Sequence, residues 1–266
     1  MGKKIKIGAL ISGGGTNLQA IIDACEQGQI DGQMVFVGSD VNGVGGLARA
    51  AQHQIPCFVI DYRAIIAQYR QAPQQVSLPS DFNLEEIKSK QSLFPSQADT
   101  HKVDAFLKSR AIAESHMLAK INAYQVDLLV LAGFMRNLTP YFIDRFNTDR
   151  NHPRIMNIHP ALLPSFPGVD GYGDTFRYGC KVGGCTVHFV DYGEDSGPII
   201  GQKAFPIAEG DDLDAIKRKG LELEWQLYPA CIQLFAQGRL HVVTMTHKLT
   251  NNTIFQRKVV NIVTIG

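Results

Sequence analysis

The sequence contains no apolar run that approaches the roughly 20 residues needed to span a membrane. It also has no excess charge of one sign, because 26 Lys and Arg residues against 25 Asp and Glu residues give a formal net charge of +1 at pH 7. A nearly neutral chain has no general attraction to nucleic acid or to anionic membranes, so we expect neither as a partner. With 45% hydrophobic residues over 266 positions, the composition predicts a globular protein with a substantial core.

Closely spaced cysteines are lacking as well. The five cysteines are odd in number and widely spread, and even Cys180 and Cys185 are too far apart for a CxxC pair. This pattern favours reduced thiols over a disulfide framework or a zinc site. The residues after Met1 also lack the apolar segment of a secretory signal peptide. We therefore expect a cytoplasmic protein without a bound metal.

Strand-like and helix-like segments alternate along the first part of the chain, which is typical of an α/β protein with a doubly wound, mostly parallel sheet. The expected strands cover residues 4–12, 34–39, 57–60, 126–131 and 154–158, and the expected helices cover 17–27, 45–54 and 100–124. Further along, strands at 185–190 and 199–205 flank a turn, and a long helix at 213–237 follows. Gly220 and Pro229 should weaken or bend that helix.

Three segments depart from the alternation. Residues 61–100 are polar and interrupted by prolines, so we interpret them as a surface insertion with a short helix near 83–90. Residues 164–184 are rich in proline and glycine, which predicts a long irregular loop. We therefore expect a single domain over 1–240, which contains the insertion, and a short C-terminal extension over 241–266, which is predicted to be a β-hairpin.

The step Asn157-Ile158-His159-Pro160 ends an apolar stretch. Alternate residues of a strand point to the same face, and Pro160 cannot continue a paired strand, so Asn157 and His159 should project together at a carboxyl end. Ligands bind at this edge in open α/β sheets. An amide and an imidazole placed there can stabilise an oxyanion and move a proton. A capped strand end with a satisfied histidine is the structural alternative.

A glycine loop lies between the first expected strand and helix, in Ser12-Gly13-Gly14-Gly15-Thr16-Asn17. Glycines allow backbone amides to approach an anion, and the helix start adds the positive end of a dipole, so the loop suits a phosphate. No Gly-Lys-Ser/Thr follows, which excludes a Walker loop. A dinucleotide site is supported by Asp40 at the end of the second strand, but Leu18 stands where the third glycine belongs. A plain glycine turn capped by Thr16 or Asn17 is the structural alternative.

The turn after residue 190 carries Asp191, Glu194 and Asp195. Such a cluster is commonly solvated, but a carboxylate held near His159 would raise the pKa of the imidazole and favour its cation. Three other features also have ordinary explanations. Residues 131–136 form a strand exit, His188 suits a core or edge position, and Glu224 on the last helix would ordinarily be solvated or paired.

Together, these motifs resemble the glycinamide ribonucleotide formyltransferases, the folate-dependent transformylases of purine biosynthesis. The resemblance covers residues 4–240 and is carried, in the family's order, by Ser-Gly-Gly-Gly-Thr-Asn-Leu-Gln-Ala-Ile (12–21), Leu-Ala-Gly-Phe-Met-Arg (131–136), Asn-Ile-His-Pro-Ala-Leu-Leu-Pro (157–164) and Val-His-Phe with Asp-Ser-Gly-Pro-Ile (187–199).

The resemblance implies a Rossmann-like formyltransferase fold and transfer of a formyl group from 10-formyltetrahydrofolate to the amine of glycinamide ribonucleotide, without metal or nicotinamide. It implies a catalytic trio of Asn157, His159 and Asp195, and ribose binding by Glu224. The substrate phosphate would be held by Gly15, Thr16 and Asn17. The folate pocket would be formed by Met135, Arg136, Asn137, Leu138, Val190 and Asp191.

The chain departs from the family's common pattern at the 61–100 insertion and at residues 170–174, which replace a His-containing stretch. Within the superfamily, a formyltetrahydrofolate deformylase or another formyltransferase is the alternative function. Outside it, a dinucleotide-binding oxidoreductase is the less favoured one. Whether the protein is a monomer or a homodimer is left open.

Overall fold

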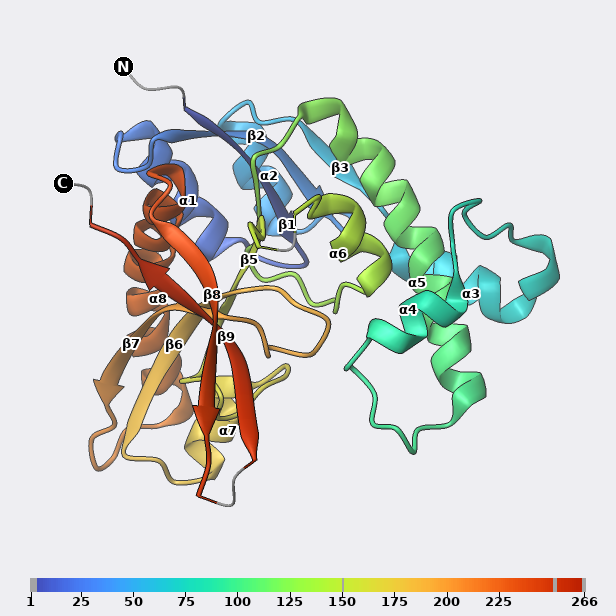
Figure 1. Ribbon diagram of the computed structural model, residues 1–266. Coiled ribbons are helices and arrows are strands. Elements are labelled where there is room, and N and C mark those ends of the chain that lie inside the picture. The colour runs from blue at the N-terminus through green and yellow to red at the C-terminus, as the bar shows by residue number, and fades with distance from the viewer. Residues whose placement is uncertain (1–3, 150, 251–252, 265–266) are drawn as a thin grey trace.

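A computed structural model describes residues 4–149, 151–250 and 253–264. Among these residues, seven strands form one sheet in the order β3-β2-β1-β4-β5-β6-β7 (Figure 1). The strands are β1 (Ile5–Ile11), β2 (Gly32–Ser39), β3 (Cys57–Val59), β4 (Leu128–Leu131), β5 (Ile155–His159), β6 (Val182–Phe189) and β7 (Ile199–Pro206). β1 to β5 pair in parallel, whereas β6 and β7 are antiparallel. The predicted doubly wound, mostly parallel sheet is confirmed.

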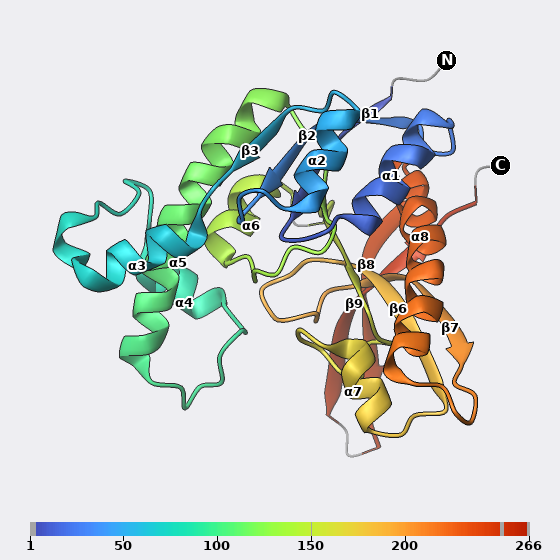
Figure 2. The same cartoon turned by 180° about the vertical axis from the view of Figure 1, so that it is seen from behind.

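Helices cover both faces of this sheet, as Figures 1 and 2 show from opposite sides. One face packs against α1 (Thr16–Glu26), α2 (Gly45–Gln52) and α8 (Leu213–Ala236), and the other against α5 (Thr100–Ile121) and α6 (Pro140–Phe146). All four residues of β4 are buried, as predicted for a central strand covered on both faces. Asp99 caps α5 by accepting hydrogen bonds from the backbone amides of His101 and Lys102, at 2.9 and 3.3 Å.

The 61–100 segment is more structured than its polar composition predicts. The short helix is present as α4 (Leu84–Lys90), but a second helix, α3 (Tyr62–Gln71), was not predicted. Its first residue, Tyr62, is fully buried, and Asp61 caps it by accepting from Ala64 N at 2.8 Å. A local cap and one deeply packed aromatic side chain therefore stabilise a helix in a polar segment.

The prediction of an irregular loop at 164–184 is wrong for the middle of this segment, which forms the helix α7 (Gly171–Arg177). Glycine is required there by close packing, since a Cβ at Gly171 would lie 2.7 Å from the Pro160 carbonyl oxygen. Tertiary contacts thus override the low helix propensity of glycine. Similarly, α8 continues through Pro229 without an interruption.

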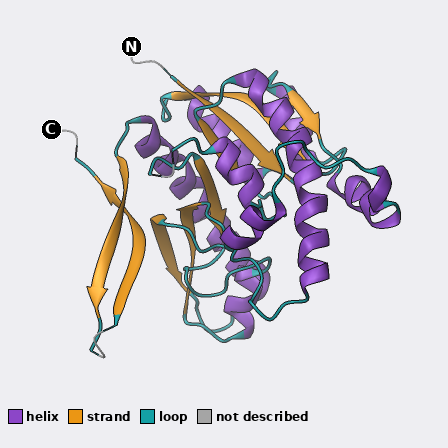
Figure 3. Cartoon of the chain, turned by 45° about the vertical axis from the view of Figure 1, so that its right-hand side comes forward, coloured by secondary structure: helices purple, strands orange, loops and turns teal. Residues whose placement is uncertain are grey.

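The C-terminal residues form the predicted hairpin, with β8 (Leu240–Lys248) antiparallel to β9 (Ile254–Ile262). Residues 251–252, which belong to the predicted extension, lie outside the described residues. Leu240, Val242 and Val260 pack against the main core, while most other described residues of the hairpin are exposed, and the hairpin lies beside the main sheet (Figure 3). The domain boundaries at 61–100 and 240 stay predictions. Within the described part of the chain, no helix is both long and apolar enough to cross a membrane.

Candidate functional site

The carboxyl ends of β1, β4 and β5 meet at one edge of the sheet, where β1 has neighbours on both sides. Chains leave this edge in opposite directions, so a crevice opens there. A cleft of about 480 Å³ lies at this edge. Its size suits a small-molecule ligand.

The glycine loop crosses from β1 to α1 at this edge. The N-cap of α1 is Gly15, whose φ of 74° is left-handed, and no side chain caps the helix within the described residues. Neither Thr16 nor Asn17 therefore provides the cap of the structural alternative. A Cβ at Gly15 would lie 2.7 Å from Gly46 Cα, so the loop also depends on glycine for its close approach to α2. The first amides of α1 remain suited to an anion.

The strand β5 places Asn157 and His159 on the cleft, as the alternation predicts. His159 is only 2% exposed, and its Nδ1 lies 3.1 Å from Asp195 Oδ2. Asn157 Nδ2 donates to the other oxygen of Asp195 at 3.4 Å. The predicted trio is thus assembled around one carboxylate.

Asp195 lies in the turn between β6 and β7 and has a left-handed φ of 48°. A non-glycine residue rarely adopts this conformation, and such outliers are concentrated at functional sites. Its carboxylate also accepts a hydrogen bond from Gly168 N at 2.8 Å. Burial alone would raise the pKa of Asp195, but hydrogen bonds from His159 and His188 outweigh it and hold that pKa well below its usual range.

Both ring nitrogens of His159 face acceptors. Nδ1 faces Asp195, and Nε2 donates to the Phe166 carbonyl oxygen at 2.7 Å. Only the doubly protonated imidazolium can donate to both. Burial lowers the pKa of His159, but the hydrogen bond and charge of Asp195 raise it by more, so the net direction is upward. The expectation of a charged histidine agrees with this geometry.

His188 belongs to the same cluster, although its sequence context favoured a core position. It is 2% exposed, and its Nε2 lies 3.5 Å from Asp195 Oδ1 and 3.3 Å from Asn157 Nδ2. Pairing of β5 with β6 places it directly opposite Asn157. Only this strand register reveals its proximity, and the sequence does not specify the register.

Glu224 is buried, and each of its two carboxylate oxygens accepts a hydrogen bond. Its Oε1 accepts from the Tyr172 hydroxyl and its Oε2 from Asn17 Nδ2, both at 2.6 Å. Burial raises the pKa of Glu224, and the two hydrogen bonds oppose that shift. Tyr172, on the unpredicted helix α7, is the partner that sequence reasoning missed.

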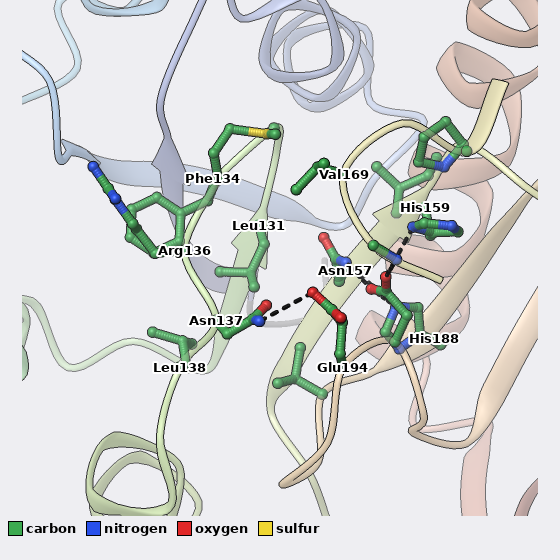
Figure 4. A pocket seen from close by; sticks show the side chains of 18 of the residues that line it. Leu131, Phe134, Arg136, Asn137, Leu138, Asn157, His159, Val169, His188 and Glu194 are labelled. Atoms are coloured by element: carbon green, nitrogen blue, oxygen red, sulfur yellow. Dashed lines mark hydrogen bonds and ion pairs between the residues drawn. The ribbon is translucent and has the colours of Figure 1, made fainter. Parts of the chain in front are cut away.

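Nearly all predicted site residues line this cleft. Figure 4 shows Asn157, His159 and His188 on one side, with Phe134, Arg136, Asn137 and Leu138 opposite. The cleft is lined by Asn17, Met135, Arg136, Asn137, Leu138, Asn157, His159, Val190, Asp191, Asp195 and Glu224. Gly15 and Thr16 do not line it, and Thr16 instead borders a second hollow between α1 and α8.

Arg110 of α5 is a cleft residue without a counterpart in the prediction. Its Nε and Nη1 are buried and have no hydrogen-bond partner among the described residues. The guanidinium carbon lies 4.9 Å from the ring centroid of Phe106 and 5.4 Å from that of Tyr62. A guanidinium with two such donors is suited to an anionic group of a ligand.

Asp40, the residue that supports a dinucleotide site, is not free to bind a ribose. It is 3% exposed, and its two oxygens accept from Ser12 Oγ at 2.5 Å and from Arg136 Nε at 2.6 Å. Among the described residues, no group of three or more His, Cys, Asp or Glu side chains is placed to hold a metal ion.

A model of the family described as "Formyl transferase" matches residues 5–232. The chain is 36% identical over 239 residues to phosphoribosylglycinamide formyltransferase of Haemophilus influenzae, with 89% of this chain and 90% of that one covered. It is 34% identical to the trifunctional purine biosynthetic protein adenosine-3 of Gallus gallus, covering 90% of this chain but 19% of that protein. The crystal structure of glycinamide ribonucleotide transformylase 1 from Symbiobacterium toebii superposes with a TM-score of 0.71 at 35% identity, covering 99% of this chain and 96% of that one. The chain belongs to the formyl transferase family.

Proposed function

We propose that the protein transfers the formyl group of 10-formyltetrahydrofolate to the amine of glycinamide ribonucleotide, giving formylglycinamide ribonucleotide in de novo purine biosynthesis. The observation that carries this proposal is the cluster of Asn157 and His159 around Asp195, in a cleft with different chemistry at its two ends. The similarity to the Haemophilus influenzae enzyme supports the choice of substrates.

The nucleotide end of the cleft is formed by Asn17, in the first turn of α1, and by Glu224. We assign the substrate phosphate to the amides at Gly15, Thr16 and Asn17, where the helix dipole favours an anion. Glu224 would accept hydrogen bonds from the ribose hydroxyls. The Tyr172 hydroxyl and Asn17 Nδ2 occupy one acceptor site on each oxygen of Glu224, so the ribose hydroxyls would bind at the acceptor sites that remain.

The folate end is formed by Met135, Arg136, Asn137, Leu138, Val190 and Asp191. Arg110 extends this assignment, because a folate carries carboxylates and two nitrogens of the Arg110 guanidinium have no hydrogen-bond partner among the described residues. Across this end, Asn137 Nδ2 donates to Glu194 Oε1 at 3.1 Å, which ties the two sides of the pocket together.

Catalysis would proceed by direct attack of the substrate amine on the formyl carbon. The new C–N bond turns the formyl oxygen into an oxyanion, which Asn157 and charged His159 stabilise. The intermediate then collapses with cleavage of the bond to N10 of the folate. The proton lost by the attacking nitrogen is delivered to N10, with Asp195 assisting through water. For His159 Nε2 to reach the oxyanion, the Phe166 carbonyl must leave the position it occupies.

The reaction as proposed uses side chains as donors and proton carriers, so it requires neither metal nor nicotinamide. The absence of nucleic-acid and membrane partners, the cytoplasmic location, and the choice between monomer and homodimer stay predictions. The folate is a co-substrate that is consumed in each turnover.

The direct test is to incubate the purified protein with both substrates and to detect formylglycinamide ribonucleotide by mass spectrometry. Release of formate without the nucleotide would favour the deformylase alternative. Protection from thermal unfolding by NADH, but by neither substrate, would favour the oxidoreductase. The occupied carboxylate of Asp40 already weighs against the latter.

The phosphate assignment predicts that Thr16→Asp raises KM for the nucleotide by at least about tenfold, because a negative charge is placed next to the phosphate. KM for the folate should change by less than about twofold. An acidic residue in the first turn of a helix is favourable, so Tm should not fall. Thr16→Asn is the uncharged control, and equal rises of both KM values in Thr16→Asp would contradict the assignment.

The folate assignment predicts that Arg110→Met raises KM for 10-formyltetrahydrofolate by about tenfold, through loss of the cation that binds a carboxylate. Stability should be retained, since two buried donors without acceptors are removed and an apolar side chain of similar length can pack on the Phe106 and Tyr62 rings. Lys102→Met removes an equal charge from an exposed position of the same helix and serves as the control. An unchanged folate KM in Arg110→Met would exclude Arg110 from the pocket.

A further inference from the structure

We infer that Asp40 is a positioning residue that fixes the segment 133–137 to the glycine loop and thereby joins the two ends of the cleft. The inference rests on the proposed function only where it calls that segment the folate end. Asp40 directly follows β2, and its side chain is 1% exposed. It is therefore a buried acid and not a surface ligand group.

The two oxygens of Asp40 bind two different parts of the site. Oδ1 accepts from the Ser12 hydroxyl at 2.5 Å, and Oδ2 accepts from Arg136 Nε at 2.6 Å. Ser12 is the residue after β1, where the glycine loop begins, and Arg136 lines the folate end. One carboxylate therefore holds both.

Ser12 extends the connection through its other atoms. Its hydroxyl oxygen accepts from Met135 N at 2.8 Å, and its backbone amide donates to the Gly133 carbonyl at 2.9 Å. The Ser12 hydroxyl donates its one proton to Asp40, and its oxygen accepts from the Met135 amide. One hydroxyl therefore connects the Asp40 carboxylate to the backbone of segment 133–137.

The pairing also sets what Arg136 can contribute. A guanidinium has five N–H donors, and Asp40 binds the one at Nε, so the donors at the other two nitrogens keep a fixed direction for a ligand. The negative charge of Asp40 offsets the positive charge of Arg136. Arg136 therefore contributes hydrogen-bond donors of fixed direction more than it contributes net charge. Arg110, without a hydrogen-bond partner at Nε and Nη1 among the described residues, supplies the net positive charge.

The test is Asp40→Asn, which keeps the shape but removes the charge and one acceptor. KM for 10-formyltetrahydrofolate should rise about tenfold, the loss typical of one charge-assisted hydrogen bond. The nucleotide KM and kcat should each change by less than about threefold.

The control is Asp127→Asn, which alters a carboxylate that accepts from Lys6 N at 2.8 Å, at the amino end of the same sheet. It should leave both KM values unchanged. Hydrogen–deuterium exchange over residues 133–137 requires no ligand, and it should accelerate in Asp40→Asn but not in Asp127→Asn.

These readouts separate the inference from the proposed function. If the wild type forms no formylated product, the proposed function fails, and faster exchange at 133–137 in Asp40→Asn would still support Asp40 as the positioning residue. Unchanged exchange in Asp40→Asn, or an equal rise of both KM values, would overturn the inference.

Discussion

His159→Ala is expected to lower kcat by about 100- to 1,000-fold, the usual cost of losing one oxyanion donor. The substitution removes a charged ring that Asp195 holds at 3.1 Å, next to Asn157 on the same strand. Since the oxyanion exists only in the transition state and the intermediate, both KM values should change by less than about threefold. Steady-state kinetics with each substrate varied in turn provides the measurement.

The matched control is His152→Ala. His152 also pairs with a carboxylate, as its Nδ1 lies 2.7 Å from Asp149 Oδ2, but its side chain is 73% exposed and does not line the cleft. Its loss should leave kcat unchanged. Near wild-type turnover in His159→Ala would refute the assigned mechanism.

Asp195→Asn is expected to lower kcat by at least about 100-fold and to lower the pKa of His159. In the wild type, burial lowers that pKa, and the hydrogen bond and charge of Asp195 more than compensate. Without the carboxylate charge, the effect of burial dominates, and His159 becomes neutral at lower pH than it does in the wild type. The variant therefore loses the charged donor under conditions in which the wild type keeps it.

The imidazole resonances of labelled histidine, followed by NMR across a pH titration, measure this shift directly. The His159 pKa is raised by folding, so the pair's contribution to stability is complete below the unfolded histidine pKa and is lost as pH rises through the folded value. The Asp195 pKa is lowered by folding, so acid removes the same contribution from the other side. An unchanged His159 titration in Asp195→Asn would contradict the electrostatic coupling.

Much of this site could be predicted from local sequence. Pro160 marks the end of β5, and strand alternation places Asn157 and His159 on the same face. The glycines of the first loop and the apolar run of β4 likewise specify their own local structure. In each case, residues that are adjacent in the sequence are enough to predict the local structure.

Contacts between residues that are far apart in the sequence could not be predicted from local sequence. His188 approaches Asn157 through the β5–β6 register, and Arg136 reaches Asp40 across 96 positions of sequence. Nothing near either residue in the chain signals its partner. Tyr172 escaped prediction for a related reason, because its helix forms in a glycine-rich segment that is stabilised by packing and not by propensity.

The Phe166 carbonyl bears on the design of inhibitors for this cleft. Its oxygen lies 2.7 Å from His159 Nε2, so the protein carries an internal competitor for any ligand oxygen aimed at that donor. A compound that mimics the tetrahedral intermediate must first displace this group, and its apparent affinity equals its intrinsic affinity multiplied by the fraction of molecules in which the carbonyl has withdrawn. A compound that fills only the folate end leaves the His159 bond to Phe166 intact and avoids that loss.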